Sequence, residues 1–184
     1  MSDTDYREIE ARWINLNQEE IEKKLESIGA VLKGEYFFQE WIFKKEEWVG
    51  KARRIRVRTD GTQTWVTYKA NSTWEVDSTE EVEFTVSSPE AAVKFFESIE
   101  IPIFLHQEKK RRQYTLGDIT FEIDNWPLIP MVLEIEGASE EEVKKGAALL
   151  NLSWGDALFE DQKVIHEKYF NIDLESMTEY TFEK

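Results

Sequence analysis

Several short segments of this chain carry a charged side chain at every second residue. The intervening residues are apolar, as in the run from Arg54 to Arg58, and different segments carry charges of opposite sign. Because side chains alternate between the two faces of a β-strand, each segment presents one ionic face and one apolar face. Two arrangements satisfy this pattern: a sheet with its ionic face in water, or a closed barrel whose ionic faces surround a cavity. Such a cavity would suit a polyanion together with divalent metal ions.

The remaining strand and helix signals predict an α+β fold. Capping residues start helices at Asn17, Ser88 and Ser139, and a further helix is expected from near Asp156. The Asp60-Gly61 pair predicts a hairpin turn. The predicted strands are residues 6–14, 36–43, 53–58, 64–69, 80–86, 106–116, 119–125 and 131–137. These helices are too few to provide the crossover connections that a parallel sheet requires. We therefore expect an eight-stranded antiparallel closed β-barrel with helices packed outside.

Length and composition narrow the class of protein. The 184 residues predict one domain, residues 1–184, with a core of about residues 5–170 and a loosely ordered tail, 171–184. The absence of cysteine excludes disulfides and thiolate metal sites, and it fits a cytoplasmic location. With 38 acidic residues and only 2 histidines, a metal site would hold a hard ion such as Mg²⁺ or Mn²⁺.

The charge of the chain limits its partners. A formal net charge of -15 argues against binding to a nucleic acid polymer or to an anionic membrane. No apolar stretch reaches the roughly 20 residues that span a bilayer. A small anion is still compatible, because exposed charges are screened over about 8 Å and a local group of arginines then decides the sign of a site. The apolar outer faces leave room for a homodimer.

The paired charges follow one another in a characteristic order. In sequence they are Glu8 and Glu10 with Arg12, Arg56 and Arg58, Thr67 and Lys69, Glu81 and Glu83, Lys110 and Arg112, Asp124, and Glu134 with Glu136. This order resembles that of the CYTH superfamily, the triphosphate tunnel metalloenzymes, across residues 8 to 136. The first strand of that family reads Glu-x-Glu-x-Lys, and Arg12 stands here in the place of the lysine. Glu122 shares the strand parity of Asp124 but not the motif, so it is left out of the predicted set.

The resemblance implies a tunnel in which basic side chains hold a triphosphate and acidic side chains hold one or two Mg²⁺ or Mn²⁺ ions. The implied substrate-binding residues are Arg56, Arg58, Lys69, Lys110 and Arg112. The implied metal ligands are Glu8, Glu10, Glu81, Glu83, Asp124, Glu134 and Glu136. The implied catalytic residues are Glu8, Glu10, Arg12 and Lys69. The alternative for these charges is a solvated sheet face that serves solubility and surface ion pairs.

Three functions remain open at this point. The first is a metal-dependent triphosphatase acting on inorganic triphosphate or on a nucleoside or thiamine triphosphate. The second is a class IV adenylate cyclase, which the same resemblance implies and which would convert ATP to cyclic AMP and pyrophosphate. The third is a noncatalytic polyphosphate-binding module, which Arg12 keeps open because a guanidinium retains the charge of lysine but is harder to deprotonate.

Overall fold

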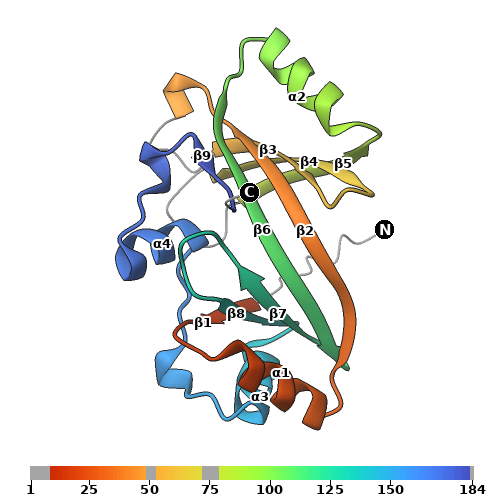
Figure 1. Ribbon diagram of the computed structural model, residues 1–184, viewed down its shortest axis with the longest axis vertical. Helices are drawn as coiled ribbons and strands as arrows, with labels where there is room; N and C mark the ends of the chain where they lie inside the picture. Colours follow the sequence, from red (N-terminus) through yellow and green to blue (C-terminus); the bar gives the residue numbers. More distant parts are fainter. Residues whose placement is uncertain (1–8, 49–52, 72–78, 183–184) are drawn as a thin grey trace. The chain divides into compact units, whose positions relative to one another are not determined.

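The computed structural model describes residues 9–48, 53–71 and 79–182 (Figure 1). Over these residues it consists of a largely antiparallel sheet and four α-helices, which confirms the α+β class. The chain divides into two compact units, each made from separate stretches of sequence. Unit 1 comprises residues 1–36 and 110–171, and unit 2 comprises residues 37–109 and 172–184. The expected single domain stays a prediction.

Unit 1 contains the first and the last strand of the predicted pattern of paired charges. Its strands are β1 (Ile9–Trp13), β8 (Val132–Gly137), β7 (Ile119–Asn125), the second part of β6 (Ile103–Leu116) and the first part of β2 (Val31–Phe43), side by side in that order. The register aligns Arg12 of β1 with Glu134 of β8, and Glu134 with Glu122 of β7. Three neighbouring strands therefore place charged side chains in one row.

The helices of unit 1 are α1 (Gln18–Ser27), α3 (Glu140–Leu149) and α4 (Gln162–Phe170), with a 3₁₀ turn, η2 (Trp154–Asp156). The predicted caps are confirmed, since Asn17 and Ser139 each accept a hydrogen bond from the backbone three residues later. The last helix begins at Gln162 and not near Asp156, because Leu158 is extended and forms a two-bond backbone bridge with Arg12.

The apolar core of unit 1 lies between its strands and helices α1 and α3. Leu133 and Ile135 of β8 are fully buried there, and burying side chains of this size stabilises a fold by about 1.5–3 kcal/mol each. Gly146 lets α3 approach the sheet closely, since a Cβ atom at this position would lie 2.9 Å from Cγ2 of Ile135. The opposite face of the same strands is left for charged side chains.

Unit 2 contains the rest of β2, the first part of β6, β3 (Arg53–Thr59), β4 (Thr64–Asn71) and β5 (Thr79–Val86). The 3₁₀ turn η1 (Glu46–Trp48) precedes β3, and α2 (Pro89–Ser98) covers the apolar face, where Val57 and Val66 pack with Phe96. The predicted hairpin is confirmed, because Asp60 accepts hydrogen bonds from the backbone of Thr62 and Gln63.

The prediction of a loosely ordered C-terminal tail is wrong for residues 172–182. They contain the 3₁₀ turn η3 (Leu174–Ser176) and β9 (Glu179–Tyr180), which pairs in parallel with β6. Tyr180 is 2 % exposed, and the backbone N–H of Phe182 donates to the carboxylate of Glu108. These contacts involve residues more than 70 positions apart, so no local sequence signal reports them.

The closed barrel is not confirmed. Among the described residues the strand order is β1-β8-β7-β6-β2-β3-β4-β5, which has two ends, with β9 beside β6. Closure needs backbone hydrogen bonds between the first and the last strand, and alternation of side chains does not determine whether those two strands pair. None of the described helices combines the length and apolarity required to cross a bilayer.

Candidate functional site

Three carboxylates converge on the face of unit 1 opposite its core. One oxygen atom each from Glu122, Glu134 and Glu136 lies within 4.8 Å of the others. Glu122 and Glu134 are 4 % and 8 % exposed, so their charges are largely removed from water. We call these residues the carboxylate group; it contains two of the predicted metal ligands and adds Glu122, which the motif had omitted.

Arg111 holds the carboxylates of β7 in place. Its Nε and Nη2 atoms donate to the two oxygens of Asp124, each at 2.6 Å, and Nη1 pairs with Glu122. Burial disfavours a charged guanidinium, but Asp124 and Glu122 outweigh it, and the pKa of Arg111 is raised above its usual value. Both oxygens of Asp124 are therefore engaged by arginine in this structure.

Arg12 links β1 to the carboxylate group. Its Nε atom lies 2.7 Å from Oε2 of Glu134, its Nη2 donates to Glu10 at 2.6 Å, and its Nη1 donates to the backbone carbonyl of Glu160 at 3.0 Å. Burial lowers the pKa of Arg12, yet Glu134 and Glu10 more than offset that effect and the net shift is upward. The predicted residues Glu10, Arg12 and Glu134 are thus brought together, with the guanidinium between the two carboxylates.

The donor set of the carboxylate group fits a hard divalent cation. It consists of carboxylate oxygens, which Mg²⁺ and Mn²⁺ prefer. Burial, reinforced by Glu10 and Asp124, exceeds the opposing effect of Arg12 and raises the pKa of Glu134 to about 8. The pKa of Glu134 is thus raised although Arg12 lies beside it.

The structure gives Arg112 partners outside the carboxylate group. Lys110 is exposed, and Arg112 pairs with Glu22 of α1 at 2.6 Å and with Glu35 at 2.7 Å. Arg112 also lies over the ring of Tyr114, which belongs to the apolar core. The basic residues that contact the charged faces are Lys109 and Arg111, at positions that alternate with the predicted pair, Lys110 and Arg112.

Basic side chains dominate the corresponding face of unit 2. Arg56 and Arg58 alternate on β3 with the core residues Ile55 and Val57, and the register aligns Lys69 of β4 with Arg54. We call Arg56, Arg58 and Lys69, together with the buried Lys109 of β6, the basic cluster. Arg56, Arg58 and Lys69 were predicted from the sequence, whereas Lys109 was not.

A buried carboxylate, Glu40 of β2, orients the basic cluster. Glu40 is 2 % exposed, accepts a hydrogen bond from Gln107 at 2.5 Å and lies 3.7 Å from Nη1 of Arg56. Its burial would raise the pKa, but Arg56, Lys109 and Arg58 lower it below the usual value. Arg58 also stacks on the rings of Phe38 and Trp65, with its Cζ atom 5.0 and 5.2 Å from the ring centroids.

The predicted acids of β5, Glu81 and Glu83, lie opposite Lys69 and Thr67 of β4. Lys69 pairs with Glu81 at 2.9 Å, and the hydroxyl of Thr67 donates to Glu83 at 2.7 Å. Arg56 lies 4.0 Å from the same carboxylate of Glu83. The observed partners of Glu81 and Glu83 therefore include Lys69 and Arg56, two side chains that were expected to hold phosphate. Glu8, predicted as a metal ligand, lies outside the described residues.

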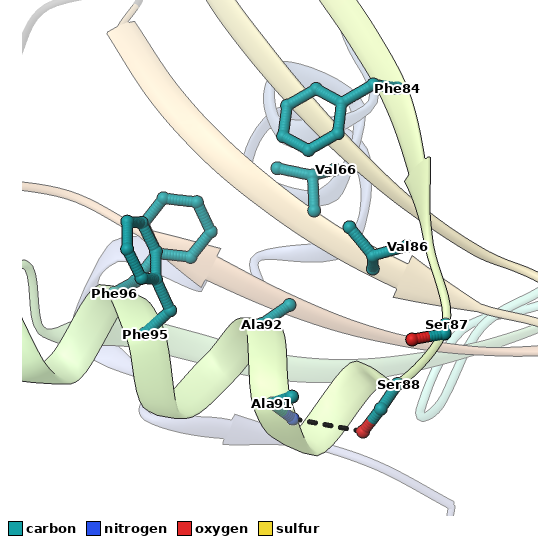
Figure 2. Close-up of a pocket in the computed structure, with 9 residues that line it drawn as sticks. All are labelled: Val66, Phe84, Val86, Ser87, Ser88, Ala91, Ala92, Phe95 and Phe96. Carbon is teal, nitrogen blue, oxygen red and sulfur yellow. Dashed lines mark hydrogen bonds between the residues drawn. The ribbon is translucent and has the colours of Figure 1, made fainter.

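A separate cavity of about 390 Å³ lies between α2 and strands β4 and β5 of unit 2. Figure 2 shows Val66, Phe84 and Val86 facing Ala92 and Phe96 across it. No charged side chain lines this cavity, and Ser87 and Ser88 are its polar residues. An apolar cavity of this kind does not suit a phosphate group.

Parity could have revealed part of what the sequence analysis missed. Glu122 alternates with the apolar residues Phe121 and Ile123, and Arg111 has the parity opposite to Tyr114. The run from Glu108 to Arg112 is charged throughout, so its own pattern has no period of two. Only the apolar residue that follows it indicates which positions face the core.

One protein family matches most of the chain. The sequence profile of the CYTH domain matches residues 7–164. The chain belongs to the CYTH family. A search of curated proteins gives no match.

Solved structures resemble this CYTH protein over most of its length. The PH1012 protein of Pyrococcus horikoshii OT3 is 25% identical, with a TM-score of 0.69, covering 84% of this chain and 96% of its own. A putative adenylate cyclase from Vibrio parahaemolyticus is 14% identical, with a TM-score of 0.71 and coverages of 86% and 96%. The putative adenylyl cyclase HpAC1 from Hippeastrum, described as having a dominant triphosphatase activity, is 10% identical, with a TM-score of 0.61 and coverages of 88% and 95%. The last two share the fold with this CYTH protein.

Proposed function

We propose that this CYTH protein is a divalent-metal-dependent hydrolase of a triphosphate. The observation that carries the proposal is the separation of charge within one sheet: a carboxylate group suited to a cation in unit 1, and a basic cluster suited to phosphate in unit 2. Burying charged side chains of either sign costs free energy unless they neutralise each other or a ligand. A metal–triphosphate complex carries both kinds of complementary charge.

We also propose that the sheet closes into the barrel expected from the sequence. The alternation of apolar and charged residues on β1, β3, β7 and β8 supports this proposal, because it leaves one face of each strand covered by helices and the other ionic. The family membership supports it as well.

Each side chain would have a defined task in the reaction. Arg56 and Arg58 would bind phosphate oxygens through planar guanidinium forks, and Lys69 and Lys109 would supply point charges. Glu40 would keep Arg56 oriented before the substrate arrives. Glu122, Glu134 and Glu136 would hold Mg²⁺ or Mn²⁺. When bound, such an ion polarises a phosphoryl oxygen and lowers the pKa of an attacking water.

Adenylate cyclase activity is the second candidate. It is supported by the description of the Vibrio parahaemolyticus structure as a putative adenylate cyclase. Triphosphatase activity is placed first because the Hippeastrum protein, although named a putative adenylyl cyclase, is described as having a dominant triphosphatase activity. Both reactions require a metal ion and side chains that bind the phosphates. They differ in which phosphorus atom the nucleophile attacks.

The deciding experiment identifies the product. Purified protein is incubated with inorganic triphosphate, thiamine triphosphate or ATP in the presence of Mg²⁺ or Mn²⁺. We expect orthophosphate, with activity lost on chelation and reduced at least 100-fold by Glu136→Gln. Arg112→Gln, on the opposite face of β6, serves as the control and should retain activity. Cyclic AMP with pyrophosphate would favour the cyclase, and substrate binding without any product would favour a noncatalytic polyphosphate-binding module.

A further inference from the structure

Arg12 lies between two of the predicted metal ligands, Glu10 and Glu134. Its Nη2 and Nε atoms lie 2.6 and 2.7 Å from their carboxylate oxygens. Glu134 belongs at the same time to the carboxylate group. The same carboxylate therefore contacts a guanidinium and belongs to the candidate metal site.

The guanidinium is anchored by more than its ion pairs. Its third nitrogen, Nη1, donates to the carbonyl of Glu160 at 3.0 Å, and the backbone of Arg12 exchanges two hydrogen bonds with Leu158. Arg12 is 8 % exposed. An incoming cation that displaced it from Glu10 and Glu134 would leave a buried guanidinium without its counter-charges, which is a strongly unfavourable state.

Convergence of oxygen atoms, and not freedom from other contacts, distinguishes the carboxylate group from the other acids of unit 1. Glu122 also has partners, since Arg111 pairs with one of its oxygens and Gln113 donates to the other. Arg111 donates hydrogen bonds to both oxygens of Asp124, and Arg12 donates one to an oxygen of Glu10. Among the described residues of unit 1, the carboxylates whose oxygens converge are those of Glu122, Glu134 and Glu136. This set is smaller than the predicted set of metal ligands, and Glu10 is outside it.

We propose that Arg12 acts as a positioning residue in the place of a second cation, so that the carboxylate group binds a single divalent ion. The inference rests on the proposed function, because it concerns the same metal site. On this proposal Glu10 is an ion-pair partner of Arg12 and not a ligand of the metal ion. Arg12 would keep the Glu134 carboxylate fixed, and Glu122, Glu134 and Glu136 would hold the ion.

Isothermal titration of the substrate-free protein with Mn²⁺ tests this proposal without depending on turnover. We expect one ion per chain for the wild type and for Arg12→Lys, which keeps a cation in place. Arg12→Gln removes the cation and should bind a second Mn²⁺, or bind the first at least tenfold more tightly. Arg112→Gln, which loses two ion pairs on the other face, should behave as the wild type.

Two further variants separate the roles of Glu10 and Glu136. Glu10→Gln should change the Mn²⁺ dissociation constant by less than threefold, and Glu136→Gln should raise it more than tenfold. Circular dichroism of each variant shows whether it is folded before titration. If Arg12→Gln does not fold, the wild-type stoichiometry and the Glu10→Gln titration keep the test decisive. Two ions bound to the wild type, or a Glu10→Gln variant that loses Mn²⁺, would overturn the inference.

The number of bound ions and the reaction product together distinguish a failure of this inference from a failure of the proposed function. Two bound ions with production of orthophosphate would overturn the role of Arg12 and leave the hydrolase intact. One bound ion with no product from any triphosphate would support the role of Arg12 and overturn the hydrolase. A wild type that binds no Mn²⁺ would overturn both.

Discussion

Two neighbouring arginines of β6 should differ sharply in their importance for stability. Arg111 has a 15% exposed side chain, and its partners Glu122 and Asp124 have side chains that are 5% and 4% exposed. Arg112 also makes two ion pairs, but its side chain is 31% exposed and that of its partner Glu35 is 59% exposed. The pair therefore compares the same substitution, Arg→Gln, on the two faces of one strand.

The expected magnitudes follow from burial. Removing one partner of a buried ion pair costs about 3–5 kcal/mol, because it leaves the other charge uncompensated. An exposed ion pair is worth roughly 0–1 kcal/mol. We expect Arg111→Gln to lower the free energy of unfolding by about 3–5 kcal/mol and Arg112→Gln by less than about 1 kcal/mol. For a chain of this length the first change corresponds to a fall in Tm of roughly 10 °C.

Urea unfolding followed by tryptophan fluorescence measures both values in metal-free buffer. A double variant, Arg111→Gln with Asp124→Asn, should recover part of the loss, because it also removes a carboxylate that Arg111 had neutralised. Equal unfolding midpoints for Arg111→Gln and Arg112→Gln would refute the assignment of the two faces of β6. The same result would restore Arg112 as a candidate phosphate ligand.

Two further predictions concern pH and packing in unit 1. Because burial raises the pKa of Glu134 to about 8, the folded state retains a proton that the unfolded state releases near its ordinary value of about 4.5. Stability in metal-free buffer should therefore fall as the pH rises from about 5 to 8, and Glu134→Gln should flatten this slope; thermal melts across that range with an unchanged slope would contradict the shift. Gly146→Ala should destabilise the protein by about 1–3 kcal/mol despite the higher helix propensity of alanine, because the new Cβ atom would lie 2.9 Å from Cγ2 of Ile135. An equal or higher Tm for Gly146→Ala would show that α3 can shift away from the sheet.

Local signals predicted most of the secondary structure. Asn17, Ser88 and Ser139 cap the helices that follow them, and Asp60 closes the β3–β4 hairpin. These interactions join residues within a few positions, so the residue types alone indicate them. The period-two alternation likewise identified the strands and the charged face of β3, where Arg56 and Arg58 lie.

The sequence by itself determined the family, the strands and the presence of two opposite kinds of charged face. Only the tertiary structure decided which charges meet: Arg12 with Glu134, Arg111 with Asp124, and Glu40 with Arg56. Alternation assigns a residue to a face only where apolar neighbours mark the other face, and the charged run from Glu108 to Arg112 has no such markers. The register between strands, which brings distant residues within hydrogen-bonding distance, depends on the packing of the whole sheet.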